Sequence, residues 1–178
     1  KKIIGSCITL IDQIGFEAFN FKKLAAEIQS TEASIYRYFR SKRHLLGYLF
    51  AWYWSWLQYR ILLKTTNIAE PKRRLETLIE VLAESVTNDP SVPHIDESVL
   101  HRIVVSESDR SLAAYQARSG GKEGGLEAYE SLCRTITGYI RELKPKYEYP
   151  QALTLTLLAT THRQRFYAAN FPNVTEVN

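Results

Sequence analysis

The sequence is poor in several features that mark whole classes of protein. Methionine is absent, including from position 1, so we expect the chain to lack its native start. The two cysteines, Cys7 and Cys133, are too few for a disulfide framework and have no metal-binding spacing. No apolar run reaches the roughly 18 to 20 residues that a membrane-spanning helix needs, and the start lacks the pattern of a secretory leader. We therefore expect a cytoplasmic protein that has no membrane segment.

Sequence motifs for catalysis and metal binding are also missing. The four histidines, His44, His94, His101 and His162, show no paired spacing. There is no nucleophile elbow, phosphate-binding glycine loop or pair of catalytic acids. We therefore expect no metal ion, no other cofactor and no enzymatic activity. A helical enzyme whose catalytic residues come together from different helices stays an alternative, and turnover of a captured ligand would reveal it.

Positive charge is concentrated in the first quarter of the chain. The formal net charge of the protein is +4. Residues 1–47 hold eight lysines and arginines against four acidic residues, whereas the remaining 131 residues hold 15 of each. The whole excess therefore lies in the N-terminal part, which predicts that a polyanion, if one is bound, binds there.

Apolar residues recur at helical spacing along most of the chain, and no segment has the sustained alternation of a half-buried strand. We therefore expect an all-α fold of about nine helices. A first amphipathic helix should end at Gly15, which suits a C-terminal cap. Its apolar face is formed by Ile4, Ile8, Ile11 and Ile14.

Polar residues suited to helix N-caps divide the next part of the chain. Asn20 can cap a short second helix and Thr31 a third. Ser41 can cap a long fourth helix that should run to about residue 63. The residues expected to face inward are Leu24, Ala25 and Ile28 in the second helix, and Ile35 and Phe39 in the third.

Further helices are predicted beyond the fourth, separated by turn signals. Pro71 suits the first turn of a fifth helix, which should end before the turn-forming residues 88–93. A sixth helix is expected at about 96–106 and a seventh at about 109–118. The glycine-rich residues 119–125 are typical of a mobile loop.

The second and third short helices, joined by a tight turn, have the layout of a helix-turn-helix. The third helix must pack inward while its other face enters a major groove about 12 Å wide. Ser34 and Arg37 lie three residues apart on that outer face, and Tyr36 can offer its hydroxyl to a phosphate. Capped short helices also occur in ordinary bundles, so the charge asymmetry is needed to strengthen this interpretation.

The first turn of the fourth helix offers a further contact with DNA. Lys42 lies there, and both its charge and the backbone N–H groups of that turn suit a phosphate. Together with the third helix, this turn predicts one continuous DNA-binding surface. The expected DNA-binding residues are Thr31, Glu32, Ala33, Ser34, Tyr36, Arg37, Tyr38 and Lys42.

Residues 15–46, GFEAFNFKKLAAEIQSTEASIYRYFRSKRHLL, resemble the N-terminal DNA-binding region of the tetracycline-repressor (TetR) family. This resemblance implies a homodimer whose recognition helices enter successive major grooves. It also implies a DNA-binding domain over 1–47 and an effector-binding and dimerisation domain over 48–178. The matching features are Gly15 with Phe16, Leu24 with Ala25, Ala33 with Ser34, the segment from Tyr36 to Phe39, and Ser41 with Lys42 leading to Leu45.

The chain departs from the family pattern at the turn before the third helix. The family usually has glycine where this chain has Gln29, and a small apolar residue where it has Ser30. If Gln29 has to adopt a positive φ, its backbone would be strained, because that conformation is uncommon outside glycine and asparagine. The departure concerns the geometry of the turn and not the fold.

The fourth helix is unusually rich in aromatic residues, with three tryptophans among them. Core packing explains any one of these side chains, since a helix that is apolar nearly all round is central to a fold. Buried tryptophan N–H groups nevertheless need partners, so we also consider a site for a small apolar or aromatic effector. The candidate ligand-binding residues are Trp52, Trp56, Tyr59, His101, Tyr115 and Cys133.

Two long helices should end the chain, one over about 126–143 and one from Pro150 to about residue 170. By family resemblance, these helices form the dimer contact, pairing about a two-fold axis into a four-helix bundle. The alternative is that their apolar faces only close the core of the single chain. The candidate interface residues are Leu132, Ile136, Tyr139, Leu143, Leu153, Leu157 and Phe166.

These observations together predict a ligand-responsive transcriptional regulator. We expect a repressor that binds palindromic operator DNA as a homodimer and is released by a small-molecule effector. The alternative is a diverged family member that serves as a small-molecule or protein-partner scaffold without binding DNA. Binding to random duplex at low salt distinguishes the two, because a working basic surface binds DNA even non-specifically.

Overall fold

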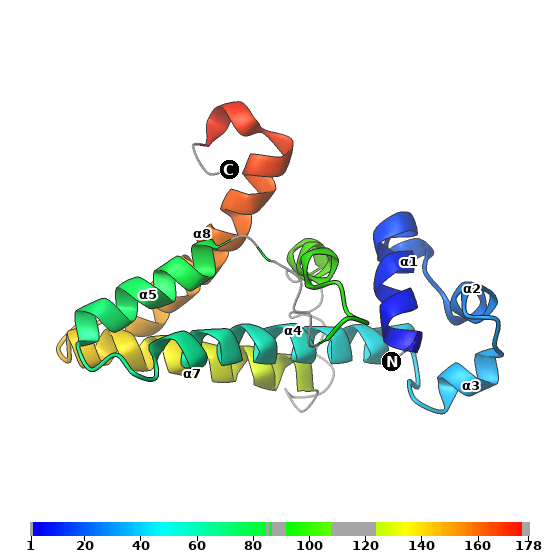
Figure 1. The fold of residues 1–178 in the computed structure, drawn as a ribbon, viewed down its shortest axis with the longest axis horizontal. Helices are drawn as coiled ribbons and strands as arrows, with labels where there is room; N and C mark the ends of the chain where they lie inside the picture. The colour runs from blue at the N-terminus through cyan, green and yellow to red at the C-terminus, as the bar shows by residue number, and fades with distance from the viewer. Residues whose placement is uncertain (1, 85, 87–91, 108–123, 176–178) are drawn as a thin grey trace. The chain divides into compact units, whose positions relative to one another are not determined.

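The computed structural model describes residues 2–84, 86, 92–107 and 124–175. All regular elements in these residues are helices, which confirms the predicted all-α fold (Figure 1). Residues 97–107 are also helical. The expected helix at 109–118 lies outside the described residues, as does most of 119–125. The elements are α1 Lys2–Ala18, α2 Phe21–Glu27, α3 Glu32–Tyr36, α4 Lys42–Thr65, α5 Pro71–Ala83, α7 Gly124–Leu143, α8 Pro150–Asn170 and the 3₁₀ helix η1 Pro172–Val174.

The chain divides into two compact units. The first unit comprises Lys1–Tyr53 and Val86–Ala128, and the second comprises Trp54–Ser85 and Tyr129–Asn178. Helices α4 and α7 each begin in the first unit and continue into the second. The first unit therefore joins the N-terminal helices to a segment that begins at Val86, after the first part of the second unit. The expected division of function at residue 47 stays a prediction.

The N-terminal helices begin where the polar caps were predicted. The Asn20 side chain accepts a hydrogen bond of 2.9 Å from the N–H of Lys23 at the start of α2. Ser41 does the same for α4, accepting from the N–H of His44 at 3.1 Å. The end of α1 differs from the prediction: Gly15 leaves the helical conformation (φ 75°, ψ 156°), but the helix resumes and ends at Ala18. Glycine tolerates this positive φ because it has no Cβ.

The core of the first unit is formed by the apolar faces of these helices and of α4. Helix α2 contacts both α1 and α3. The fully buried side chains of Ile8, Leu24, Ile35 and Leu45 come from four different helices. Each such side chain contributes about 1.5–3 kcal/mol relative to an exposed position. Hydrophobic burial therefore fixes α3 against its neighbours.

The helix of residues 97–107 is attached to α1 within the first unit. Arg102 forms a two-pronged ion pair with Asp12 of α1, with N–O distances of 3.3 and 2.9 Å. A Cβ on Gly5 would come within 2.6 Å of the backbone oxygen of His94, so α1 passes very close to the turn before this helix. The Asp96 side chain caps the helix, accepting from the N–H of Val99 at 3.0 Å.

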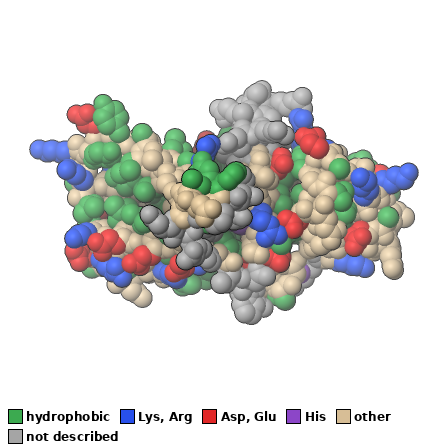
Figure 2. All heavy atoms as spheres, turned by 90° about the horizontal axis from the view of Figure 1, so that it is seen from above, with side chains coloured by type: hydrophobic (Ala, Val, Ile, Leu, Met, Phe, Trp, Pro, Cys, Tyr) green, Lys and Arg blue, Asp and Glu red, His purple; other side chains and the backbone are tan. Residues whose placement is uncertain are grey.

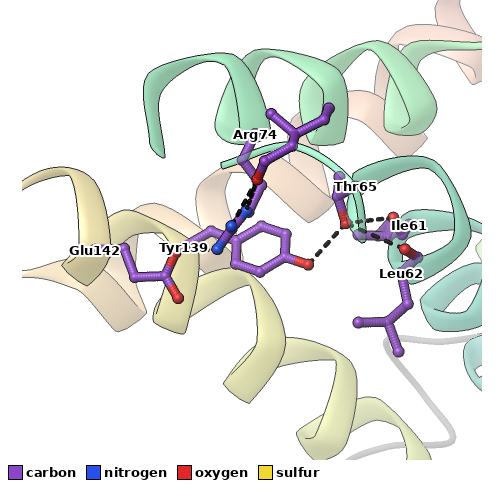
Figure 3. A network of polar contacts seen from close by, with 7 residues as sticks. Ile61, Leu62, Thr65, Arg74, Tyr139 and Glu142 are labelled. Atoms are coloured by element: carbon purple, nitrogen blue, oxygen red, sulfur yellow. Dashed lines mark hydrogen bonds and ion pairs between the residues drawn. The ribbon is translucent and has the colours of Figure 1, made fainter. Parts of the chain in front are cut away.

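The second unit is held by polar contacts between helices as well as by its apolar core. Thr65 at the end of α4 hydrogen-bonds the hydroxyl of Tyr139 in α7 at 2.8 Å (Figure 3). Arg74 of α5 lies over the Tyr139 ring, bonds the backbone oxygen of Ile68 and pairs with Glu142. These contacts join α4, α5 and α7 at one place.

Each unit contains one free cysteine. Cys7 of α1 is fully buried, and burial raises the pKa of its thiol. Cys133 of α7 is half-buried, and burial raises the pKa of that thiol as well. The described helices include none that is both long enough and apolar enough to cross a membrane.

Candidate nucleic-acid interface

Helix α3 is short, and it is anchored at both ends. Thr31 is its N-cap, and its side chain accepts a hydrogen bond of 3.3 Å from the N–H of Ser34. Ile35 is fully buried, as predicted. Phe39 is also buried, but it lies beyond the end of α3 at Tyr36, where its N–H still bonds the Ile35 oxygen at 3.0 Å. The predicted inward face therefore continues past the helix into the following turn.

The opposite face of α3 is open to solvent. Glu32, Ala33 and Arg37 are exposed, and Tyr36 and Tyr38 have 52% and 64% of their surface exposed. The Tyr36 ring packs edge-on against Phe21 of α2 with centroids 4.9 Å apart. The aromatic ring is thus held in place while much of it stays accessible. Contact of these exposed side chains with a polyanion stays a prediction, and Arg37, the C-cap of α3, and Tyr38 lie after the helix and not on it.

Ser34 takes part in a small hydroxyl network that the sequence did not indicate. Its hydroxyl donates to the backbone oxygen of Thr31 at 2.7 Å. The hydroxyl of Ser30, in the preceding turn, lies 2.7 Å from that of Ser34. Because the Ser34 proton is used on Thr31, Ser30 must be the donor in this second bond. Ser34 is only partly exposed, so Ser30 helps to hold it at the surface of α3.

The turn between α2 and α3 has the strained geometry that the sequence raised as a possibility. Gln29 has φ 53°, the one positive φ outside glycine in the described residues. Its N–H bonds the oxygen of Ala26 at 3.2 Å, and the N–H of Ser30 bonds that of Ala25 at 2.8 Å. This pair of bonds is the Schellman motif, which normally has glycine at the left-handed position. The turn therefore closes with glutamine in a place that favours glycine.

Lys42 is partly buried and its ammonium group is already occupied. It donates to the backbone oxygens of Phe16, Glu17 and Phe19 at 3.1, 3.0 and 3.3 Å. It also lies 4.9 Å from the centre of the Phe16 ring. The expected contact of Lys42 with a phosphate stays a prediction, and the structure gives this side chain a set of acceptors inside the protein.

Two further cations belong to this surface, although they were not among the expected residues. Arg40 and Arg43 are exposed, and they lie between the end of α3 and the first turn of α4. The N–H of Arg40 is bonded by Nδ1 of His44 at 3.3 Å, which fixes the backbone of this segment. Figure 2 shows blue Lys and Arg side chains standing out around α2 and α3. The basic run at 40–43 was the available signal, but such runs are usually only solvated.

Residues 3–49 match the family model described as "Bacterial regulatory proteins, tetR family". The N-terminal domain is a tetR-family domain. This finding confirms the resemblance that the sequence suggested, over slightly more residues than the motif itself. No curated protein matches the chain.

Solved structures similar to this one extend over nearly the whole chain. A protein from Saccharomonospora viridis described as a transcriptional regulator, in complex with choline, is 19% identical, with a TM-score of 0.66 over 97% of this chain and 85% of its own. A tetR-family protein from Vibrio parahaemolyticus is 19% identical, with a TM-score of 0.64 over 96% and 86%. AibR in complex with isovaleryl coenzyme A and operator DNA is 16% identical, with a TM-score of 0.63 over 95% and 84%. At these identities the likeness shows a shared fold.

The candidate ligand-binding residues beyond the tetR-family domain are divided between the units. Trp52 and His101 belong to the first unit, whereas Trp56, Tyr59 and Cys133 belong to the second. Trp52 and Trp56 are partly buried, while Tyr59 is 61% exposed. Tyr115 lies outside the described residues. Other apolar side chains of α4 are buried in the core. These residues are Phe50, Trp54, Leu57 and Ile61.

His101 has a buried partner that the sequence did not identify. Its Nδ1 lies 2.6 Å from the hydroxyl of Tyr53 on α4, and both side chains are buried. Glu97, one helical turn before His101, is fully buried as well. Three polar side chains thus meet the apolar core of the first unit: Tyr53 from α4, and Glu97 and His101 from the helix that pairs with α1 through Arg102. The spacing of four residues between Glu97 and His101 was visible in the sequence, but their burial was not.

The candidate dimer residues fall into different environments. Leu132 and Ile136 are fully buried within the single chain, so they belong to its own core. The Tyr139 hydroxyl is bonded to Thr65, and Leu143 is 42% exposed. Leu153 and Leu157 on α8 are partly buried, and Phe166 lies in α8. Their place in a dimer contact stays a prediction.

Proposed function

We propose that this protein is a transcriptional regulator that binds palindromic operator DNA as a homodimer, represses transcription and is released by a small-molecule effector. The observation that carries the proposal is the geometry of α3. Its cap and its buried Ile35 fix the helix, while Glu32 and Ala33 in its first turn and Arg37 at its C-terminal end are exposed to solvent in a tetR-family domain. Side chains near the start of a recognition helix are the ones that reach base edges.

Arg37 is the residue best suited to read sequence. An arginine can form two hydrogen bonds with the O6 and N7 atoms of guanine, which is the commonest specific contact in the major groove. Tyr36 and Thr31 carry hydroxyl groups suited to phosphates, which position the protein without reading sequence. The side chain of Arg37 is exposed and makes no hydrogen bond or ion pair with another described residue. It is therefore available for DNA.

The similar structures support a ligand-responsive regulator. One of them, AibR, holds both isovaleryl coenzyme A and operator DNA, and the regulator from Saccharomonospora viridis holds choline. In this chain we propose that an effector binds beyond the tetR-family domain and that His101 reads a polar group of it. An effector can release DNA only if it binds the DNA-free conformation more tightly than the DNA-bound one.

We propose that α8 supplies the centre of the dimer contact. The exposed side chains Ala152, Leu155, Thr156, Ala159 and Thr160 recur every three to four residues, so they form one uncharged stripe. Small and apolar side chains let two helices approach closely about a two-fold axis. An Ala159→Glu variant should then sediment as a monomer while the wild type sediments as a dimer. If the Ala159→Glu variant still sediments as a dimer, α8 does not form the centre of the interface.

Binding to DNA tests the proposal directly. The wild type should retard random duplex at low salt, and selection from a randomised library should yield a palindrome with half-sites about 34–36 Å apart or a multiple of that. Arg37→Ala should lose about 1–3 kcal/mol of discrimination on the selected site and little affinity for random duplex. Arg141→Ala, an exposed arginine of α7, is the matched control and should bind as the wild type does.

The possible outcomes separate the competing functions. Absence of any binding to random duplex at low salt would favour a scaffold that has lost its DNA contact. Equal loss by Arg37→Ala on selected and random duplex would remove Arg37 from base recognition and leave DNA binding intact.

A further inference from the structure

Three of the four described lysines in residues 2–49 bond the protein itself, whereas the fourth, Lys22, is exposed. These three donate from Nζ to backbone oxygen atoms that lie near the ends of α1 and α2. None of the three donates to a described carboxylate. The bonds are Lys2 to Ile28 at 3.2 Å, Lys23 to Ala18 at 2.8 Å, and Lys42 to Phe16, Glu17 and Phe19 at 3.1, 3.0 and 3.3 Å.

Helix geometry explains why lysines bind there. The last four backbone oxygens of a helix have no partner within it, and they carry partial negative charge. Phe16 and Glu17 lie in the last turn of α1, and Phe19 lies just after it. A lysine ammonium has three donors and no acceptor, so the three oxygens around Lys42 use all of its donors. Lys42 therefore fastens the first turn of α4 to the end of α1.

The arginines of the same domain are arranged differently. Arg37, Arg40 and Arg43 recur every three residues and are all exposed. The side chains of Arg37 and Arg40 make no hydrogen bond or ion pair with another described residue. Guanidinium groups match phosphate and guanine with two parallel hydrogen bonds, and they lose hydration more readily than an ammonium group does. Lys2, Lys23 and Lys42 thus differ from Arg37 and Arg40 in that their side chains bond backbone oxygens of the protein.

We infer that the arginines at 37, 40 and 43 carry the cationic contact with DNA, whereas Lys2, Lys23 and Lys42 brace the helices and make no phosphate contact. The inference rests on the proposed function and goes beyond it, because a lysine in the first turn of α4 would otherwise be expected to bind a phosphate. Lys42 is then a positioning residue, which acts on DNA only through the placement of α1 and α4.

The salt dependence of DNA binding separates the two roles. Each phosphate contact that is lost lowers the slope of log K against log salt by about 0.9. Arg40→Gln and Arg43→Gln should each lower this slope by about one. Lys42→Gln should leave the slope unchanged and lower the melting temperature of the protein. Lys72→Gln, at an exposed lysine of α5, is the matched control and should change neither quantity.

Acylation of lysines by acetic anhydride, followed by mass spectrometry, tests the inference in the wild-type chain. The result therefore does not depend on whether a variant folds. The ammonium of Lys42 should react slowly in the free protein, and DNA should not change its rate. Exposed Lys22 and Lys72 provide the fast reference. Fast reaction of Lys42 in the free protein with protection by DNA would overturn the inference, as would a slope lowered by about one in Lys42→Gln.

Different results would refute the proposed function and the roles assigned to the lysines and arginines. A wild type that binds no duplex would refute the proposed function, and the acylation rates of the free protein would still test whether Lys42 is a brace. A wild type that binds DNA with unchanged slopes in both arginine variants would refute the assignment to the arginines alone.

Discussion

The N-terminal helices and the second unit are held together by different kinds of polar contact. In residues 2–49, side chains mostly bond the backbone, as Asn20, Ser41 and Lys42 do. In the second unit, side chains from different helices bond one another, for example Gln58 with Thr135 at 2.9 Å. Further pairs there are Thr65 with Tyr139, Thr137 with Thr154, and Arg60 with Glu84. Backbone atoms are therefore the usual partners of polar side chains in the N-terminal helices, whereas polar side chains of different helices pair with each other in the second unit.

The largest expected effect is a loss of unfolding free energy caused by a substitution in the core of the second unit. Leu132→Ala removes a fully buried side chain from α7 and should destabilise the protein by about 2–5 kcal/mol, because the lost transfer energy is joined by a cavity. Chemical denaturation by urea measures this loss. Leu63→Ala, the same change at a side chain that is 64% exposed, should stay within about 0.5 kcal/mol. Similar losses in both variants would show that burial in the single chain does not set the stability of this unit.

A smaller effect should come from the contact network in Figure 3. Arg74→Met keeps much of the packing but removes two hydrogen bonds to the Ile68 oxygen, and should cost about 1–3 kcal/mol in thermal or urea unfolding. Glu142→Gln removes only the ion pair, whose acid is 47% exposed, and should cost less than about 0.5 kcal/mol. A larger loss in Glu142→Gln would mean that the ion pair between α5 and α7 stabilises this unit more than the contact of Arg74 with Ile68 does.

The smallest expected effect is a gain in stability and concerns the turn between α2 and α3. Gln29→Gly should stabilise the protein by about 0.5–1 kcal/mol, since glycine relieves the positive φ but has more freedom when unfolded. Gln13→Gly, at an exposed glutamine within α1, should destabilise by about 1 kcal/mol. Melting curves of the two variants therefore shift in opposite directions. A destabilised Gln29→Gly variant would show that the glutamine side chain stabilises the turn.

The same contrast explains how much the sequence could predict. Several features follow rules that act within a few residues of the chain. They are the caps Asn20, Thr31 and Ser41, the helix starts at Pro71 and Pro150, and the condition under which the backbone of Gln29 is strained. The helices that carry the candidate DNA surface were therefore predictable, and so was the buried position of Ile35.

Contacts between distant residues were not predictable. Lys42 binds the oxygen of Phe16, 26 positions away, and His101 meets Tyr53 across 48 positions. Spacing within a helix says nothing about which other helix lies opposite. For this reason the sequence does not indicate that Lys42 bonds the end of α1 or that Leu132 is fully buried within one chain.

Each unit contains one cysteine whose rate of chemical labelling can report on that unit. The thiolate is the form that reacts with an alkylating reagent, so burial and a raised pKa keep both Cys7 and Cys133 slow in the folded state. Labelling of Cys7 then requires the tetR-family domain to open, whereas half-buried Cys133 reacts faster when its surroundings in α7 loosen. The ratio of the two rates would report, in the unmodified chain, which region loosens first under heat, denaturant or an added effector.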